Sequence, residues 1–170
     1  MRTVCLFLLL LTAGCTGIPK GIVPVANFEA GRYLGGWYEI ARLDHSFERG
    51  MDEVKAVYSL RDDGGIQVVN SGLREGVRHE AVGRAYFADI PTKGYLKVSF
   101  FGPFYGSYIV FDLARDYSTA LVCGPNRDYF WILSRTPEIS AQKRAELVKK
   151  AADAGFDTRN LIFPVQTPAP

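Results

Sequence analysis

Few residues of this chain are of the types that catalyse reactions or hold metals. The two histidines, His45 and His79, are far apart, and neither has a cysteine near it in the sequence. Because a zinc-type site needs a close set of such donors, we predict no metal site and place both histidines on the surface. The acidic residues at 62–63 and 112–116 are interpreted as turns rather than as a catalytic carboxylate pair. The chain also has no Gly-rich phosphate loop and no nucleophile elbow, so no cofactor is predicted.

Cys123 is the remaining candidate for a reactive side chain. A nucleophilic thiol needs a lowered pKa, which a nearby cation or base provides, and the residues around Cys123 include none. A free cysteine is commonly a small buried hydrophobic residue. We therefore predict a buried structural cysteine and a protein that is not an enzyme, with a thiol-dependent enzyme as the alternative.

The N-terminus has the pattern of an export signal. Arg2 is followed by an apolar run at 4–11 and then by small residues that end at Cys15. Such a pattern describes a signal peptide, and the run is shorter than the roughly 20 residues that cross a membrane. Residues 11–15 resemble the lipobox of bacterial lipoproteins, in which the cysteine is diacylated and becomes the new N-terminus. This resemblance implies a signal peptide at 1–14 and a lipid anchor on Cys15.

The residues after Cys15 indicate where the anchor would hold the protein. The resemblance to lipoproteins implies the outer membrane, because Thr16 rather than an aspartate follows the cysteine. Residues 15–27 contain several Gly and Pro residues, and we interpret them as a lipidated tether. Residues 28–170 then form the folded domain.

Composition limits the remaining possibilities. The mature chain of about 155 residues suits one domain with a sizeable core. Of the three cysteines, only Cys123 stays free after processing, so no disulfide framework is predicted. The net charge of +2 without a basic run argues against a nucleic-acid partner.

The pattern after residue 28 is a series of short β-type runs separated by Gly, Pro, Asn and Asp turns. Alternation is clear in the second run, where Val54, Ala56, Tyr58 and Leu60 share one face, and in the fifth, where Leu96, Val98 and Phe100 do. Period-two patterning indicates antiparallel sheet with one apolar face. The eight runs are 37–42, 53–61, 65–73, 80–87, 95–101, 107–113, 119–123 and 129–135.

One helix and the strand count decide the fold class. A helix is predicted at 141–154, with Ser140 as N-cap and Gly155 just beyond its end. A closing run at 160–165 is a candidate edge strand. Eight antiparallel strands followed by one helix predict an all-β fold, an up-and-down barrel with a C-terminal α-helix packed outside, since closure removes exposed strand edges. An immunoglobulin-like sandwich is the rival, but it does not explain the helix.

Three motifs in the expected order resemble the lipocalin family. Gly35 and Trp37 match its G-x-W motif in the first strand, Asp116 and Tyr117 resemble the second motif, and Arg135 at the end of the eighth strand resembles the third. In that family the arginine packs across the tryptophan at the closed end of the barrel. Such a cation–π contact contributes about 0.5–2 kcal/mol.

The similarity covers essentially the whole mature chain and is closer to the bacterial lipocalins, relatives of apolipoprotein D. It implies a barrel on the periplasmic side of the outer membrane that binds a fatty acid or lysophospholipid for lipid storage, transport or membrane maintenance. It also makes a homodimer a prediction to test. The residues that resemble pocket-lining positions are Tyr58, Asn70, Val98 and Trp131, although filling of the core is an alternative for each.

Residues 100–106 place four aromatic side chains around a Gly-Pro turn, including Phe101, Phe104 and Tyr105. The strand count puts this mouth loop at the open end of the barrel. Aromatic side chains exposed there would contact lipid, a ligand or a second copy, whereas side chains folded inward would plug the barrel. A filled barrel that uses this loop to dock a partner is therefore the second function hypothesis.

Overall fold

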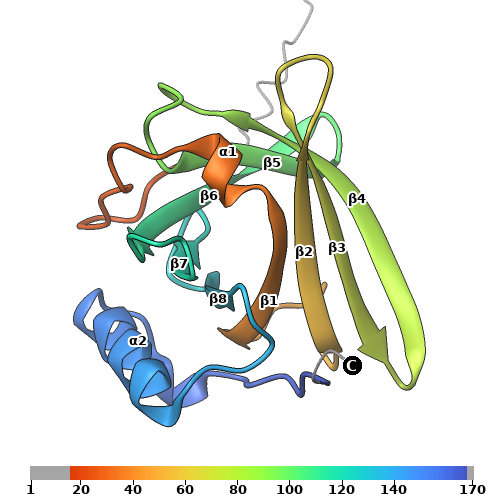
Figure 1. Ribbon diagram of the computed structural model, residues 1–170, viewed down its shortest axis with the longest axis vertical. Coiled ribbons are helices and arrows are strands. Elements are labelled where there is room, and N and C mark those ends of the chain that lie inside the picture. Colours follow the sequence, from red (N-terminus) through yellow and green to blue (C-terminus); the bar gives the residue numbers. More distant parts are fainter. Residues whose placement is uncertain (1–15, 168–170) are drawn as a thin grey trace, which may run out of the picture.

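The computed structural model describes residues 16–167, so Cys15 and the predicted signal peptide lie outside the described residues. Eight antiparallel strands follow one another around a closed barrel in which β8 pairs back with β1 (Figure 1). The predicted barrel is confirmed. The strands are β1 (Gly35–Arg42), β2 (Asp52–Leu60), β3 (Ile66–Arg74), β4 (Val77–Phe87), β5 (Tyr95–Phe101), β6 (Phe104–Leu113), β7 (Thr119–Cys123) and β8 (Phe130–Ser134).

Period-two alternation sorts the side chains between the inside and the outside of the barrel. In β2, Val54 and Tyr58 are 5% and 7% exposed and Tyr58 belongs to the interior core. Leu60 was expected to share that buried face but is 66% exposed, at the last position of the strand beside the 61–65 turn. The alternation therefore holds until the strand leaves the body of the barrel.

One end of the barrel is closed by aromatic side chains and a short helix, α1 (Ala30–Tyr33). Trp37 is fully buried and donates its indole N–H to the Tyr33 carbonyl at 2.8 Å. The Arg135 guanidinium lies 4.0 Å from the Trp37 ring centroid and donates to the Gly36 carbonyl at 2.9 Å. The expected Arg–Trp contact is thus present. The helix was not predicted, because four residues show no helical periodicity.

The predicted C-terminal helix is α2 (Ala141–Asp153), which lies outside the ring of strands (Figure 1). The Ser140 side chain accepts from the Lys143 backbone N–H, as expected of an N-cap, and Gly155 has the positive φ of 87° that suits a glycine after a helix. Leu147 and Ala151 pack into a second core on the outer wall of the barrel. Among residues 16–167, no helix is long and apolar enough to span a membrane.

The described part of the predicted tether lies along the outside of the barrel. Tyr95 donates its hydroxyl to the Thr16 carbonyl at 2.5 Å, and Ser107 donates to the Gly17 carbonyl at 2.7 Å. Ile22 is 7% exposed within the second core. Hydrogen bonds and apolar contacts therefore hold residues 16–27 against the wall, a tertiary effect that Gly and Pro content does not reveal.

The C-terminal segment does not form the expected edge strand at 160–165. It contains the 3₁₀ turn Thr158–Asn160 and one bridge between Ile162 and Arg42. Pro164 cannot donate to a strand ladder, which limits the pairing. Beyond it, the Gln166 side-chain amide donates to the carbonyls of Glu39 and Val54 at 2.8 and 2.9 Å. The segment therefore covers the place where β1 and β2 separate.

Candidate ligand-binding site

The four predicted lining residues face the inside of the barrel from four different strands. Asn70 pairs with Ala56 on β2, Val98 pairs with Gly106 on β6, and Trp131 packs against the interior core. Tyr58 is buried, whereas Asn70, Val98 and Trp131 are half-buried. The fold therefore gathers these residues around one interior space. Their contact with a ligand stays a prediction.

That interior is a buried core at the closed end and keeps partly exposed side chains towards the other end, and we call the partly exposed part the cup. Inward-facing side chains of a closed barrel keep exposed surface only where solvent enters the barrel. Val98, Tyr108 and Trp131 all keep such surface, while Trp37 at the closed end has none. Gly106 faces the same space, and a Cβ built there has no atom within 4 Å. The cup therefore has room at the level of Val98 and Gly106.

A chain of three tyrosine hydroxyls lies above the closed end. The Tyr108 hydroxyl is 2.8 Å from that of Tyr58 and 2.7 Å from that of Tyr33. Burial raises the pKa of Tyr58 and Tyr108 above the ordinary value, so both stay protonated and able to donate. Tyr108 was not predicted, although the inward side of β6 could have identified it by alternation with Val110.

A buried charged cluster lies at the opposite end, beneath the 43–51 loop between β1 and β2. Arg42 donates to the Glu39 carboxylate at 2.6 Å and to the Glu48 carbonyl at 2.9 Å. The Trp131 indole N–H donates to the Glu48 carboxylate at 3.0 Å. His45 Nε2 lies 3.1 Å from the same oxygen, but the geometry is too poorly aligned for a hydrogen bond. We call Glu39, Arg42, His45 and Glu48 the mouth cluster.

The mouth cluster was not predicted, and the prediction that His45 lies on the surface was wrong, because His45 is only 6% exposed. Its ring stacks on Phe47 with centroids 4.0 Å apart. Charged residues are seldom fully buried unless they are paired, and the partners of Arg42 become visible only after the loop folds over the mouth. Glu39 shares the inward side with Trp37, which was the available signal.

Burial shifts the proton affinities of the mouth cluster in opposite directions. Loss of solvation, with the neighbouring Glu48 carboxyl as the next cause, raises the pKa of Glu39 from 4.5 to about 8. Loss of solvation also raises the pKa of Glu48. The same effect, together with the Arg42 charge, lowers the pKa of His45 from 6.5 to about 4. At neutral pH the imidazole is therefore neutral and Glu39 keeps its proton.

These shifts predict how stability depends on pH. The raised pKa of Glu39 stabilises the fold fully below pH 4.5, and that stabilisation is lost as the pH rises towards 8. The lowered pKa of His45 acts oppositely, because stability is lost as the pH falls from 6.5 to 4. The two effects oppose each other between pH 4.5 and 6.5. Urea denaturation should show a decrease on the order of 1–2 kcal/mol between pH 6.5 and 8, and Glu39→Gln should make that decrease smaller, with Glu48 responsible for the part that stays. An equal decrease in the variant would contradict the assignment.

Cys123 lies outside the cup. It is fully buried between the barrel and α2, and burial raises the pKa of its thiol to about 12. The prediction of a buried cysteine is confirmed, and loss of solvation outweighs the lowering effect of the Arg127 charge on the thiol pKa, which is the opposite of what activates a nucleophile. No group of His, Cys, Asp or Glu side chains in the described part of the chain could hold a metal ion.

The predicted mouth loop is a tight hairpin between β5 and β6 with only Gly102 and Pro103 outside the strands. Phe101 and Phe104 are 82% and 62% exposed. Tyr105 instead lies on the outer wall, where its hydroxyl accepts from Arg84 at 3.0 Å. The two phenylalanines therefore point into solvent and do not plug the barrel.

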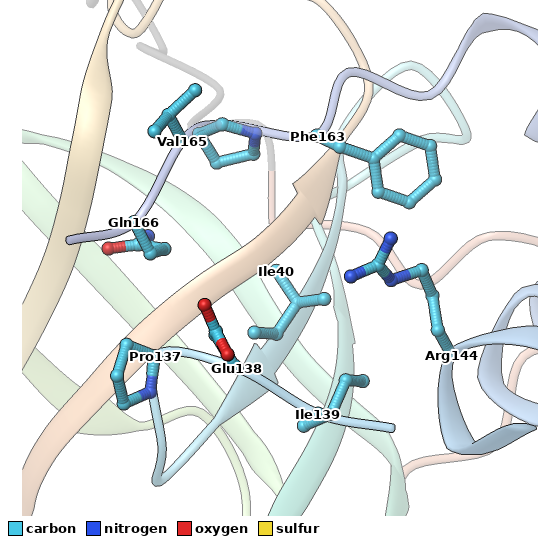
Figure 2. A pocket seen from close by; sticks show the side chains of 9 residues that line it. Ile40, Pro137, Glu138, Ile139, Arg144, Phe163, Val165 and Gln166 are labelled. Atoms are coloured by element: carbon cyan, nitrogen blue, oxygen red, sulfur yellow. The ribbon is translucent and has the colours of Figure 1, made fainter. Parts of the chain in front are cut away.

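A separate groove of about 410 Å³ lies on the outer side of β1 (Figure 2). Ile40 of β1 and Arg144 of α2 line it together with residues 137–139 and 163–166. Ile40 belongs to the second core outside the barrel. The wall of the barrel therefore separates this groove from the cup.

Comparison with known proteins agrees with this architecture. A family model described as Lipocalin-like domain matches residues 28–166. The chain is 53% identical to Outer membrane lipoprotein Blc from Vibrio cholerae over 167 residues, which cover 96% of this chain and 98% of that protein. It is 36% identical to apolipoprotein D from Bos taurus over 120 residues, 65% of this chain and 62% of that protein.

Among solved structures, insecticyanin from the tobacco hornworm Manduca sexta matches with a TM-score of 0.71 at 21% identity, covering 89% of this chain and 87% of that chain. At 21% identity, this match supports the fold and nothing further about function. The name of the Vibrio relative supports the predicted outer-membrane location. The family model spans most of the chain and agrees with the closed barrel, and the chain belongs to the lipocalin family.

Proposed function

We propose that this lipocalin binds the acyl chain of a fatty acid or lysophospholipid in its cup, while Cys15 anchors it by lipid to the periplasmic side of the outer membrane. The observation that carries the proposal is the partly exposed inner wall, where Val98 and Trp131 keep exposed surface and Gly106, which pairs with Val98, has open space beside it. An acyl chain against this wall would bury apolar surface of its own and of the wall, and each Å² buried stabilises the complex by about 25 cal/mol. Lipid storage, transport or membrane maintenance would follow from this binding, and no catalytic step is proposed.

The exposed side chains around the mouth support contact with lipid. Phe47, Val77, Phe101 and Phe104 are each more than half exposed, and they lie on the three loops and hairpins that connect β1–β2, β3–β4 and β5–β6. Exposed apolar side chains gathered on one side of a molecule mark an interaction surface. Gly17, close to the predicted anchor, lies near Pro125 in the β7–β8 loop at the same end. We propose that the mouth faces the membrane.

Lipid extraction and fluorescence titration test the proposed acyl binding. The Cys15→Ser chain, purified from the soluble periplasmic fraction, should carry stoichiometric lipid in organic extracts analysed by mass spectrometry. Adding lysophospholipid to the delipidated protein should change Trp fluorescence saturably. Because Trp37 is fully buried at the closed end and Trp131 faces the cup, Trp131→Phe should remove most of that change.

A different outcome would favour the second candidate function. Absence of both co-purified lipid and a saturable response would contradict acyl binding. The exposure of Phe101 would then favour docking of a protein partner or a second copy, and sedimentation of the wild-type chain against Phe101→Ser would separate a homodimer from a monomer.

A further inference from the structure

Tyr108 marks the level at which the cup ends and the buried core begins. Along β6, the side of the strand that faces the interior carries Gly106, Tyr108 and Val110 in order towards the closed end. Gly106 has open space beside it, Tyr108 is half-buried and Val110 has no exposed surface. A ligand that enters from the mouth along β6 therefore meets Tyr108 last, and we call this residue the floor of the cup.

The tyrosines at the floor carry one hydroxyl hydrogen that has no acceptor. The hydroxyls of Tyr33, Tyr58 and Tyr108 form two contacts, at 2.7 and 2.8 Å, with Tyr108 in the middle. Each contact uses one hydrogen, and within residues 16–167 these hydroxyls form no other hydrogen bond. One of the three hydrogens is therefore left over. Burial raises the pKa of all three tyrosines, so none of them loses this hydrogen at neutral pH.

Tyr108 is the residue that can present this hydrogen to the cup. Tyr33 and Tyr58 are 3% and 7% exposed, whereas Tyr108 is half-buried. A hydroxyl oxygen accepts two hydrogen bonds through its two lone pairs, so Tyr33 and Tyr58 can both donate to Tyr108. The hydrogen of Tyr108 is then free to turn to a ligand. The methyl end of a saturated acyl chain cannot accept it, and a buried donor without an acceptor is unfavourable.

The wall above the floor is also polar on one side. Asn70 of β3 pairs with Ala56, which is two residues nearer to the mouth on β2 than Tyr58. In the described part of the chain, Asn70 Oδ1 is buried without a hydrogen-bond partner. A ligand made only of hydrocarbon would leave both Asn70 and Tyr108 with unmet hydrogen-bonding capacity. The lower part of the cup therefore differs from an entirely apolar pocket.

We propose that the cup selects an acyl chain that carries a hydroxyl or carbonyl oxygen near its tail end, with the Tyr108 hydroxyl donating to that oxygen. This inference rests on the proposed acyl binding and adds the class of chain. Tyr33 and Tyr58 act as positioning residues, because their hydroxyls donate to the Tyr108 oxygen and fix the direction of its hydrogen. The oxygen of the chain then exchanges water for a protein donor when it is buried.

Calorimetry of the Cys15→Ser chain tests this selection with two lysophosphatidylcholines that differ only in a hydroxyl at the end of the acyl chain. Acyl chains of about twelve carbons suit the test, because the floor lies about 17 Å along β6 from Pro103. The wild-type cup should bind the hydroxylated lipid at least as tightly as the plain one. Without a partner at the floor, the cost of removing the hydroxyl from water would give the plain lipid the higher affinity.

Tyr108→Phe assigns the effect to one hydroxyl, because it keeps the ring. This variant should weaken binding of the hydroxylated lipid about tenfold relative to the plain lipid. Tyr105→Phe is the matched control, since it removes another tyrosine hydroxyl of β6 that bonds to Arg84 on the outer wall, and it should leave the ratio of the two affinities unchanged.

The outcomes separate this inference from the proposed function. Preference of the wild-type protein for the plain lipid, or an unchanged ratio in a folded Tyr108→Phe protein, would overturn the selection of an oxygen-bearing chain alone. Failure of both lipids to bind would overturn the proposed acyl binding as well. The comparison in the wild-type protein decides the question even if Tyr108→Phe does not fold.

Discussion

Replacing Gly106 by phenylalanine should abolish lipid binding while leaving the barrel folded. Gly106 faces the cup opposite Val98, and a Cβ built there meets no atom within 4 Å. A phenyl ring at this position would occupy the space that an acyl chain needs beside Tyr108. The dissociation constant for lysophospholipid should rise at least about a hundredfold, or roughly 2.7 kcal/mol. Aromatic residues suit strands, so the fold should tolerate the substitution.

The measurement is fluorescence titration, with circular dichroism and thermal unfolding as checks of folding. Gly31→Phe is the matched control, because Gly31 is exposed on α1 and its Cβ also meets no atom within 4 Å. The control adds the same ring outside the cup and should leave affinity unchanged. Unchanged affinity in a folded Gly106→Phe protein would mean that lipid does not occupy the cup.

Arg42→Met should cause the largest loss of stability. It removes the only cation of the mouth cluster and the donors to the Glu39 carboxylate and to the carbonyls of Glu48 and Met51. Removing one partner of a buried ion pair costs about 3–5 kcal/mol where the other partner is ionised, because that charge is then buried without compensation. The cost should be greater at pH 8 than at pH 6, since Glu39 can take up a proton at the lower pH.

Urea denaturation at both pH values measures this loss. Arg49→Met removes an arginine from an ion pair on the same loop, but one that is exposed to solvent. Exposed pairs contribute little, so this control should keep the wild-type midpoint. Adding Glu39→Gln to Arg42→Met should recover part of the loss. An Arg42→Met protein with a wild-type midpoint at both pH values would refute the role given to the buried pair.

Local rules were enough to predict most of the architecture. Period-two alternation and turn residues place eight strands, and the Ser140 cap and the glycine after the helix place α2. These features could be predicted because they depend on neighbours a few residues away. The contact of Arg135 with Trp37 could be expected only through the resemblance to a family, since 98 positions separate the two residues in the chain.

Tertiary structure alone decided which charged side chains face the inside of the barrel and which ones lose contact with solvent. The β1 ladder shifts register between Glu39 and Ala41, and this irregularity brings Arg42 to the same face as Glu39 and opposite Trp131. Simple alternation would have placed Arg42 on the outer face. His45 is buried because its loop folds over the mouth, where it stacks on Phe47.

The sequence by itself therefore determined the barrel, its outer helix and the inward direction of Tyr58 and Val98, whereas Asn70 and Trp131 were expected to line the pocket only through the resemblance to a family. Residue type and spacing suffice for these features, because the strand repeat carries each side chain to a known face. Only the folded structure decided that residues 16–27 lie against the wall, that the cup stays open at Gly106 and that a charged cluster lies beneath the mouth. These properties depend on contacts between segments that are distant in the chain, and on the loss of solvent that such contacts cause.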